Sequence, residues 1–226
     1  MRRTAIVAAA RTPVGRIRGV LSPVAAHSMA ALVIGEAVRR AGIQGSEVDE
    51  VIYGNLYAHD ISNMARFASL EGGLPITVPA FTIDRRCGTS LTAISLADAL
   101  IRAGDAECVL AGGVESDSNR PYVLMQQTRL HDMTPPAFRG KSMLAPDSVG
   151  NPHMGITAEN LAERYGITRE ECDAFAVESH RKATRAWDNG YFNEQIVPVE
   201  IPASKGGSAK LVDTDEVFRR DCTMET

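Results

Sequence analysis

Several features that would narrow the function of this chain at once are missing from its 226 residues. No apolar run approaches the roughly 20 residues that a transmembrane helix needs, so we expect no association with a membrane. Basic residues are scattered along the chain and number 24 against 28 acidic ones. The resulting formal net charge of -4 argues against a nucleic-acid-binding surface.

Cysteine and histidine patterns typical of metal sites are missing too. None of the four cysteines forms a C-x-x-C pair, and the five histidines have no ligand spacing with them, so no metal site is expected. Cysteines without a disulfide framework indicate a reducing compartment, and we expect a cytoplasmic protein. Two arginines and an apolar run open the chain, but the run ends at Arg11 after about six residues, which is shorter than a secretory signal requires.

What is present indicates an α/β fold. With 44% hydrophobic and 23% charged residues, the chain has the composition of a globular protein of one or two domains. Apolar runs typical of strands occur at residues 4–9, 50–55, 78–83 and 108–111, and helical periodicity occurs at residues 28–40, 64–70 and 90–102. This alternation predicts a layered unit with a mostly parallel sheet and helices on both faces, over residues 1–118.

From Asn119 the character of the sequence changes. Residues 119–152 contain five prolines and little periodicity, which is typical of a functional loop or an insertion. A short helix is predicted from His153, and Thr168 with Glu171 forms a capping box that begins a longer helix ending near Gly190. A strand at 196–201 and a turn at 205–207 follow. We therefore divide the chain into a domain of residues 1–118 and a second region of residues 119–226.

Cys87 is the candidate nucleophile, because it lies in the turn between the predicted strand 78–83 and the predicted helix 90–102. At that place the unpaired N–H groups and the dipole of the helix favour a thiolate. Arg85 and Arg86 add positive charge nearby, and the small Gly88 leaves room for a substrate carbonyl. The alternative is a buried structural thiol, as we expect for Cys108 in its apolar run.

Four segments together carry a resemblance to a known family. They are residues 9–15 (AARTPVG), the turn around Cys87, residues 111–116 (AGGVES) and, most specifically, the eight residues 153–160 (HMGITAEN). From residue 5 to about residue 221 the chain resembles the N-terminal part of the thiolases, the family of acetyl-CoA acetyltransferases and 3-ketoacyl-CoA thiolases.

The resemblance implies an acyl-transfer reaction. Cys87 would attack an acyl-CoA, form an acyl-cysteine intermediate and pass the acyl group to CoA or to the carbanion of a second acetyl-CoA, in fatty acid metabolism. A thiolate suits both steps because it is a good nucleophile and a good leaving group. CoA and acyl-CoA would be substrates, and no permanently bound cofactor is implied.

The resemblance also implies that residues 119–226 are a loop domain that covers CoA. His153 and Met154 would then lie against the pantetheine arm of CoA, and Arg219 near its nucleotide end. Each of these residues has an alternative interpretation without a ligand. His153 could cap the helix, Met154 could belong to the core, and Arg219 could be a solvated charge.

Two departures from the family pattern affect these expectations. Thiolases usually have Cys-x-Ser-Gly at the nucleophile, whereas this chain has Cys87-Gly88-Thr89-Ser90, and the extra Cβ of Ser90 puts the acyl-chain preference in doubt. The family also continues for about 100–200 further residues. That C-terminal half carries a Gly-His-Pro histidine and a second cysteine for acid-base chemistry, and the last strand of the N-terminal domain also follows the loop domain. These parts are absent here, so we expect the 226-residue chain alone not to turn over.

Other classes of function stay open at this point. A non-catalytic CoA-binding or dimerising scaffold could keep the fold without the chemistry, and a ketosynthase-type condensing enzyme also has a cysteine at a helix start. Residues 153–160 favour a thiolase over the ketosynthase. The resemblance further implies assembly as a homodimer or homotetramer through strands near the nucleophile, or with a partner chain that supplies the C-terminal half.

Overall fold

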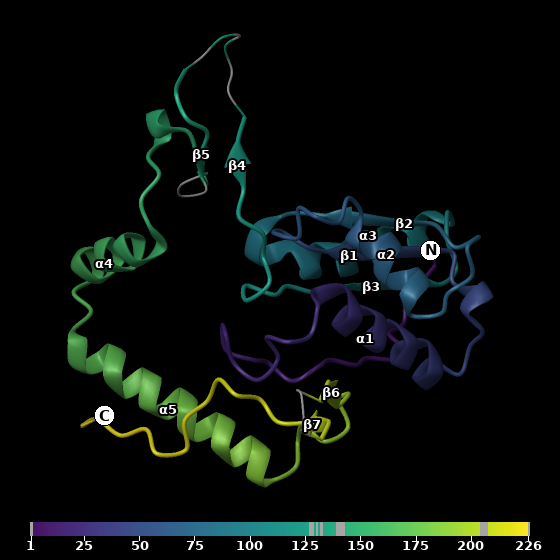
Figure 1. Ribbon diagram of the computed structural model, residues 1–226. Helices are drawn as coiled ribbons and strands as arrows, with labels where there is room; N and C mark the ends of the chain where they lie inside the picture. Colours follow the sequence, from purple (N-terminus) through teal and green to yellow (C-terminus); the bar gives the residue numbers. More distant parts are fainter. Residues whose placement is uncertain are drawn as a thin grey trace. The chain divides into compact units, whose positions relative to one another are not determined.

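The computed structural model describes residues 2–126, 129, 131, 133–138, 143–203 and 208–225 (Figure 1). Two compact units make up the chain. The first consists of Met1–Pro121 and Phe192–Val217, and the second of Tyr122–Tyr191 and Phe218–Thr226. The assignment of residues 1–118 and 119–226 to an α/β domain and a loop domain that covers CoA stays a prediction.

A parallel sheet in the order β2-β1-β3 is the centre of the first unit. Its strands are β1 (Glu50–Gly54), β2 (Ala80–Ile83) and β3 (Val109–Gly113). Val51 and Ile52 of the central strand β1 are fully buried. Burial of both side-chain directions is what an uninterrupted apolar run predicts for a strand covered on its two faces.

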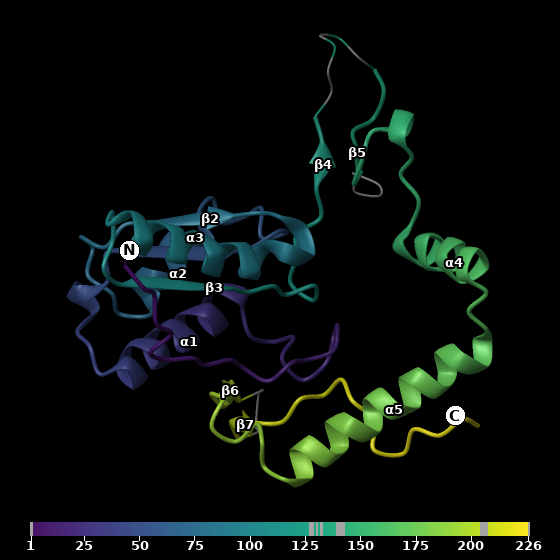
Figure 2. The same ribbon diagram turned by 180° about the vertical axis from the view of Figure 1, so that it is seen from behind.

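Helices cover both faces of this sheet. On one face, Val51 and Tyr53 of β1 pack with Ile34 of α1 (Ala26–Ala41) and Ala65 of α2 (Met64–Glu71). On the other face lies α3 (Thr89–Ala103), which is seen in front of the strands in Figure 2. Because side chains alternate along a strand, the residues of β1 are shared between these two layers. The predicted parallel sheet with helices on both faces is confirmed.

The predicted strand at residues 4–9 is wrong. These residues form no strand in the described structure, and Ile6 and Val7 are 80% and 73% exposed. The neighbouring Arg11 instead forms a single parallel bridge with Ile196. An apolar run becomes a strand only where another strand presents its N–H and C=O groups, and no described strand lies beside residues 4–9. The described part of the sheet therefore has three strands and not the four we expected.

The ends of the helices follow the sequence signals closely. Gly42 after α1 and Gly104 after α3 adopt left-handed backbone, with φ of 69° and 88°, and their N–H groups donate the C-terminal cap bonds to carbonyl groups of the last helical turn. In the second unit, α5 (Arg169–Asp188) begins with the predicted capping box, since Thr168 accepts from the N–H of Glu171 and the Glu171 carboxylate accepts from the N–H of Thr168. Glycines at the C-terminal ends and a capping box at an N-terminal end thus set these helix boundaries.

The remaining elements are short. The second unit contains the antiparallel pair β4 (Leu124–Met125) and β5 (Ala137–Phe138), together with α4 (Met154–Tyr165). The first unit contains the antiparallel pair β6 (Val199–Ile201) and β7 (Lys210–Val212). Single turns of 3-10 helix lie at η1 (Gly45–Glu47), η2 (Arg86–Gly88) and η3 (Asp147–Val149). The predicted turn at 205–207 lies outside the described residues. Among the described helices, none is both long and apolar enough to cross a membrane.

Candidate active site

Cys87 lies in η2, between the end of β2 and the start of α3, and its side chain is exposed. The predicted position between strand and helix is confirmed, and the alternative of a buried structural thiol is wrong. Cys108 provides the contrast, because it packs against the core and burial, followed by two nearby carboxylates, raises the pKa of its thiol. Of the remaining cysteines, Cys172 is exposed and Cys222 is half-buried.

Thr89 fixes the backbone around Cys87. Its side chain is buried, and its hydroxyl accepts a hydrogen bond from the N–H of Arg85 at 2.7 Å and donates to the C=O of Arg86 at 2.5 Å. Arg86 adopts a left-handed conformation with φ of 52°, and its N–H donates to the carboxylate of Asp84 at 2.8 Å. The turn that presents Cys87 is therefore held by side chains on both sides of the cysteine.

The two arginines beside Cys87 are engaged with other groups. The guanidinium of Arg86 lies 3.6 Å from the carboxylate of Asp84, which offsets its positive charge. The guanidinium of Arg85 donates to the hydroxyl of Thr92 at 3.3 Å and keeps its charge. Asp84 therefore offsets one of the two positive charges that the sequence places beside Cys87.

Two glycines of the sheet let the start of α3 approach closely. A Cβ at Gly54 would lie 2.3 Å from Cγ2 of Thr89, and a Cβ at Gly113 would lie 2.2 Å from Oγ of Ser90. The side chain of Ser90 therefore lies close to Gly113 of β3, while Ser90 itself stays exposed. At Gly88, by contrast, no heavy atom lies within 4 Å of an added Cβ, so the space beside Cys87 is open.

The candidate CoA-binding residues belong to the second unit, whereas Cys87 belongs to the first. His153 takes the N-cap position of α4 but makes no capping bond with its described side chain. Met154 is 68% exposed, which rules out a role in the core. Arg219 is exposed, and its backbone N–H donates to Nδ1 of His180. The side chains of His153, Met154 and Arg219 are therefore accessible at the surface of their unit.

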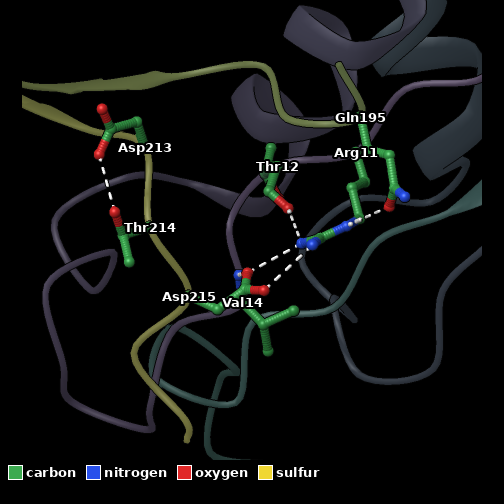
Figure 3. Close-up of polar contacts among 7 residues, drawn as sticks. All are labelled: Arg11, Thr12, Val14, Gln195, Asp213, Thr214 and Asp215. Carbon is green, nitrogen blue, oxygen red and sulfur yellow. Dashed lines mark hydrogen bonds and ion pairs between the residues drawn. The ribbon is translucent and has the colours of Figure 1, made fainter. Parts of the chain in front are cut away.

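The segment of residues 9–15 proves to be a structural link within the first unit (Figure 3). The guanidinium of Arg11 donates to both carboxylate oxygens of Asp215, at 2.8 and 3.0 Å, and further bonds reach the C=O of Thr12 and Oε1 of Gln195. The N–H of Val14 also donates to Asp215, whose side chain is only 12% exposed. A paired and largely buried carboxylate of this kind ties the two segments firmly.

Glu216 extends this link. Its carboxylate accepts the N–H groups of Arg16 and Val20 at 3.0 and 3.1 Å, and these bonds lower the pKa of the carboxyl. The chain leaves the first unit after Val217, so the link fixes the backbone shortly before Arg219. Sequence reasoning missed this pairing, because Arg11 and Asp215 lie 204 positions apart.

Comparison with known proteins places this arrangement in a family. The family model described as the thiolase N-terminal domain matches residues 4–226. The chain belongs to the thiolase family. It is 44% identical to a "Probable acetyl-CoA acyltransferase" of Staphylococcus aureus strain COL and 43% identical to an "Acetyl-CoA acetyltransferase" of Pseudomonas aeruginosa PAO1, and in both cases the match covers 100% of this chain and 58% of the relative.

The fold comparison agrees with this assignment. The crystal structure of the Bacillus anthracis acetyl-CoA acetyltransferase matches with a TM-score of 0.88 at 39% identity, covering 100% of this chain and 57% of the other. The predicted thiolase fold is confirmed. This thiolase chain thus spans somewhat more than half the length of the relatives it matches. In its described residues, no cluster of three or more His, Cys, Asp or Glu side chains is arranged to hold a metal ion.

Proposed function

We propose that this chain forms the nucleophile-bearing part of a thiolase-type acyltransferase and that Cys87 is the nucleophile. The supporting observation is an exposed thiol at the start of α3, on a turn that Thr89 and Asp84 fix from both sides. The Cys87 thiolate attacks the carbonyl carbon of an acyl-CoA. The bond from that carbon to the CoA sulfur breaks, CoA leaves as a thiolate, and the acyl group is held as a thioester on Cys87.

In the second step the acyl group leaves Cys87. Attack by the carbanion of an acetyl-CoA on the acyl-cysteine completes condensation. In thiolysis the acyl-cysteine forms differently: Cys87 attacks the 3-keto carbon of a 3-ketoacyl-CoA, the C2–C3 bond breaks, and the acetyl-CoA carbanion leaves and takes up a proton. The thiolate of a CoA then attacks the acyl-cysteine and carries the acyl group away. Both routes return the Cys87 thiolate. We propose that His153 and Met154 contact the pantetheine arm and that Arg219 binds the nucleotide end of CoA. Their exposed side chains on the second unit support this assignment.

The partners follow from the same proposal. β2 is an edge strand of the described sheet, paired on one side with β1. Such an edge presents N–H and C=O groups that a second copy could pair with, and a homodimer or homotetramer is the assembly we propose. A partner chain that supplies the rest of the enzyme is the alternative. A cytoplasmic location and a role in fatty acid metabolism complete the proposal. Sedimentation showing only monomers at micromolar concentration would contradict the homo-oligomer.

Single-turnover acylation tests the role of Cys87 directly. We expect incubation with acetyl-CoA to add one acetyl group to the intact protein, peptide mapping to locate it on Cys87, and added CoA to remove it. The Cys87→Ala variant is the control and should stay unmodified. CoA binding without any acylation of Cys87 would instead indicate a scaffold, and acetylation of Cys172 or Cys222 in preference to Cys87 would refute the assignment.

A further inference from the structure

The chain segment after the first unit is fastened to α5 at three consecutive residues. The ring of Phe218 stacks on that of Trp187, with centroids 6.1 Å apart and an angle of 8° between the planes. The guanidinium of Arg220 pairs with Asp188 at 2.5 Å and also lies over the Phe218 ring at 5.3 Å. Between these two anchors is Arg219. We call the contacts of residues 218–220 with α5 the tail clasp.

His180 of α5 contacts Arg219, the middle residue of the tail clasp. Nδ1 of His180 accepts the backbone N–H of Arg219 at 3.1 Å. Since a backbone N–H can only donate, Nδ1 must be unprotonated, and a neutral ring then has its proton on Nε2. His180 lies seven positions before Trp187, which places both on one face of α5. The face that holds Phe218 therefore also fixes the backbone of Arg219.

The groups that fix the backbone of Arg219 are different from the guanidinium that would bind a ligand. The backbone is fixed by its N–H and by its two neighbours, while the Arg219 side chain stays exposed, 3.8 Å from the carboxylate of Asp221. A guanidinium on a loose chain end would have to be ordered by its ligand. The apparent Kd is then the intrinsic Kd divided by the fraction of molecules in the binding-competent state, so the apparent affinity falls as that fraction falls. The clasp reduces that loss.

We propose that His180 is a positioning residue that holds Arg219 for the nucleotide end of CoA. The inference rests on the proposed role of Arg219 in CoA binding. Loss of the acceptor in His180→Leu should release the segment and raise the Kd for CoA about two- to tenfold, the range expected for one net hydrogen bond. The Kd for pantetheine, which lacks the nucleotide, should not change. In His180→Asn the amide oxygen can accept the same N–H, so this variant should restore tight CoA binding.

Docking of the segment can be measured without CoA, because Trp187 is the only tryptophan of the chain. We expect acrylamide to quench Trp187 fluorescence more strongly in His180→Leu than in the wild type, and His180→Asn to behave as the wild type does. Phe218→Ala, which removes the stacked ring by another route, should show the same greater quenching and the same CoA-specific loss. Arg219→Ala keeps the backbone N–H, so it should weaken CoA binding and leave Trp187 protected.

The outcomes test separately the role of Arg219 in CoA binding and the role of His180 in positioning Arg219. If Arg219→Ala does not alter the Kd for CoA, the assigned role of Arg219 is wrong, and the quenching data still decide whether His180 holds the segment. If Arg219→Ala weakens CoA binding while His180→Leu alters neither quenching nor the Kd, the positioning role of His180 is refuted. Failure of His180→Asn to restore both measurements also refutes it, because the hydrogen bond would then not be the link.

Discussion

Replacing Gly54 by alanine should disturb the turn that presents Cys87 without touching the cysteine. The new Cβ would lie 2.3 Å from Cγ2 of Thr89, whereas carbon atoms in favourable contact are about 3.5–4.0 Å apart. The start of α3 or strand β1 must then shift by roughly 1 Å. Overpacking of this kind typically costs about 1–3 kcal/mol of unfolding free energy. A displacement of about 1 Å at a reacting group can lower its rate about 100-fold.

A second substitution shows whether this single contact is responsible. Thr89→Ser removes Cγ2 but keeps the hydroxyl that bonds Arg85 and Arg86. By itself it deletes one buried methyl group, at a cost of about 0.5–1.5 kcal/mol. With Cγ2 gone, the nearest Thr89 atom to the new Cβ is the residue's own Cβ at 3.3 Å, which a small adjustment accommodates. The double variant should therefore be about as stable as Thr89→Ser.

Urea unfolding followed by circular dichroism gives the free energies, and mass spectrometry gives the rate of Cys87 acetylation by acetyl-CoA. Gly54→Ala should lower both, whereas in the double variant both should return to the values measured for Thr89→Ser alone. Gly155→Ala is the matched control for unfolding, since no heavy atom lies within 4 Å of its added Cβ, and it should not lower the free energy of unfolding. If the costs of the two single substitutions simply add in the double variant, the close contact does not set the position of the turn.

Three further predictions follow from the described contacts. Glu216, whose pKa is lowered from 4.5 by the N–H groups of Arg16 and Val20, stabilises the fold above its unfolded pKa and loses this contribution as the pH falls through its folded pKa. The free energy of unfolding of Glu216→Gln should therefore be lower than that of the wild type at neutral pH, and this difference should become smaller in acid. Thr168→Ala should cost about 1 kcal/mol by removing the cap of α5, measured by urea unfolding, with Thr168→Ser as control. Limiting iodoacetamide should label Cys87 first among the thiols, and peptide mapping that finds another cysteine labelled first would contradict this.

Short sequence patterns correctly predicted those features of the fold that depend on interactions between neighbouring residues. Helix ends at Gly42 and Gly104, the capping box at Thr168 and the strand-to-helix position of Cys87 all depend on a few consecutive residues. The structure agrees with the sequence at each of them. These signals work because a glycine that adopts positive φ, or a side chain that caps an N–H, acts within one turn of its own position.

Contacts between distant residues were the part that the sequence did not predict. Residues 4–9 have the composition of a strand, but no strand of the described sheet lies beside them, and composition does not report on neighbours. The pairing of Arg11 with Asp215 could be suspected only by searching for a carboxylate to match a partly buried arginine. The need for glycine at position 54 likewise becomes visible only when α3 lies on the sheet.

Cys87, the proposed nucleophile, and Arg219, the proposed nucleotide-binding residue, are held in the same way, and this explains why we expect their neighbours to matter as much as they do. In each case the backbone is fixed by other side chains, by Thr89 for the cysteine and by His180 and Phe218 for the arginine. Since the side chains of Cys87 and Arg219 are not what anchors their own segments, their thiol and guanidinium are exposed to a ligand. Substitutions at the anchoring residues should consequently lower activity or affinity while Cys87 and Arg219 remain intact, and chemical labelling of Cys87 in those variants would show that the thiol itself is still present.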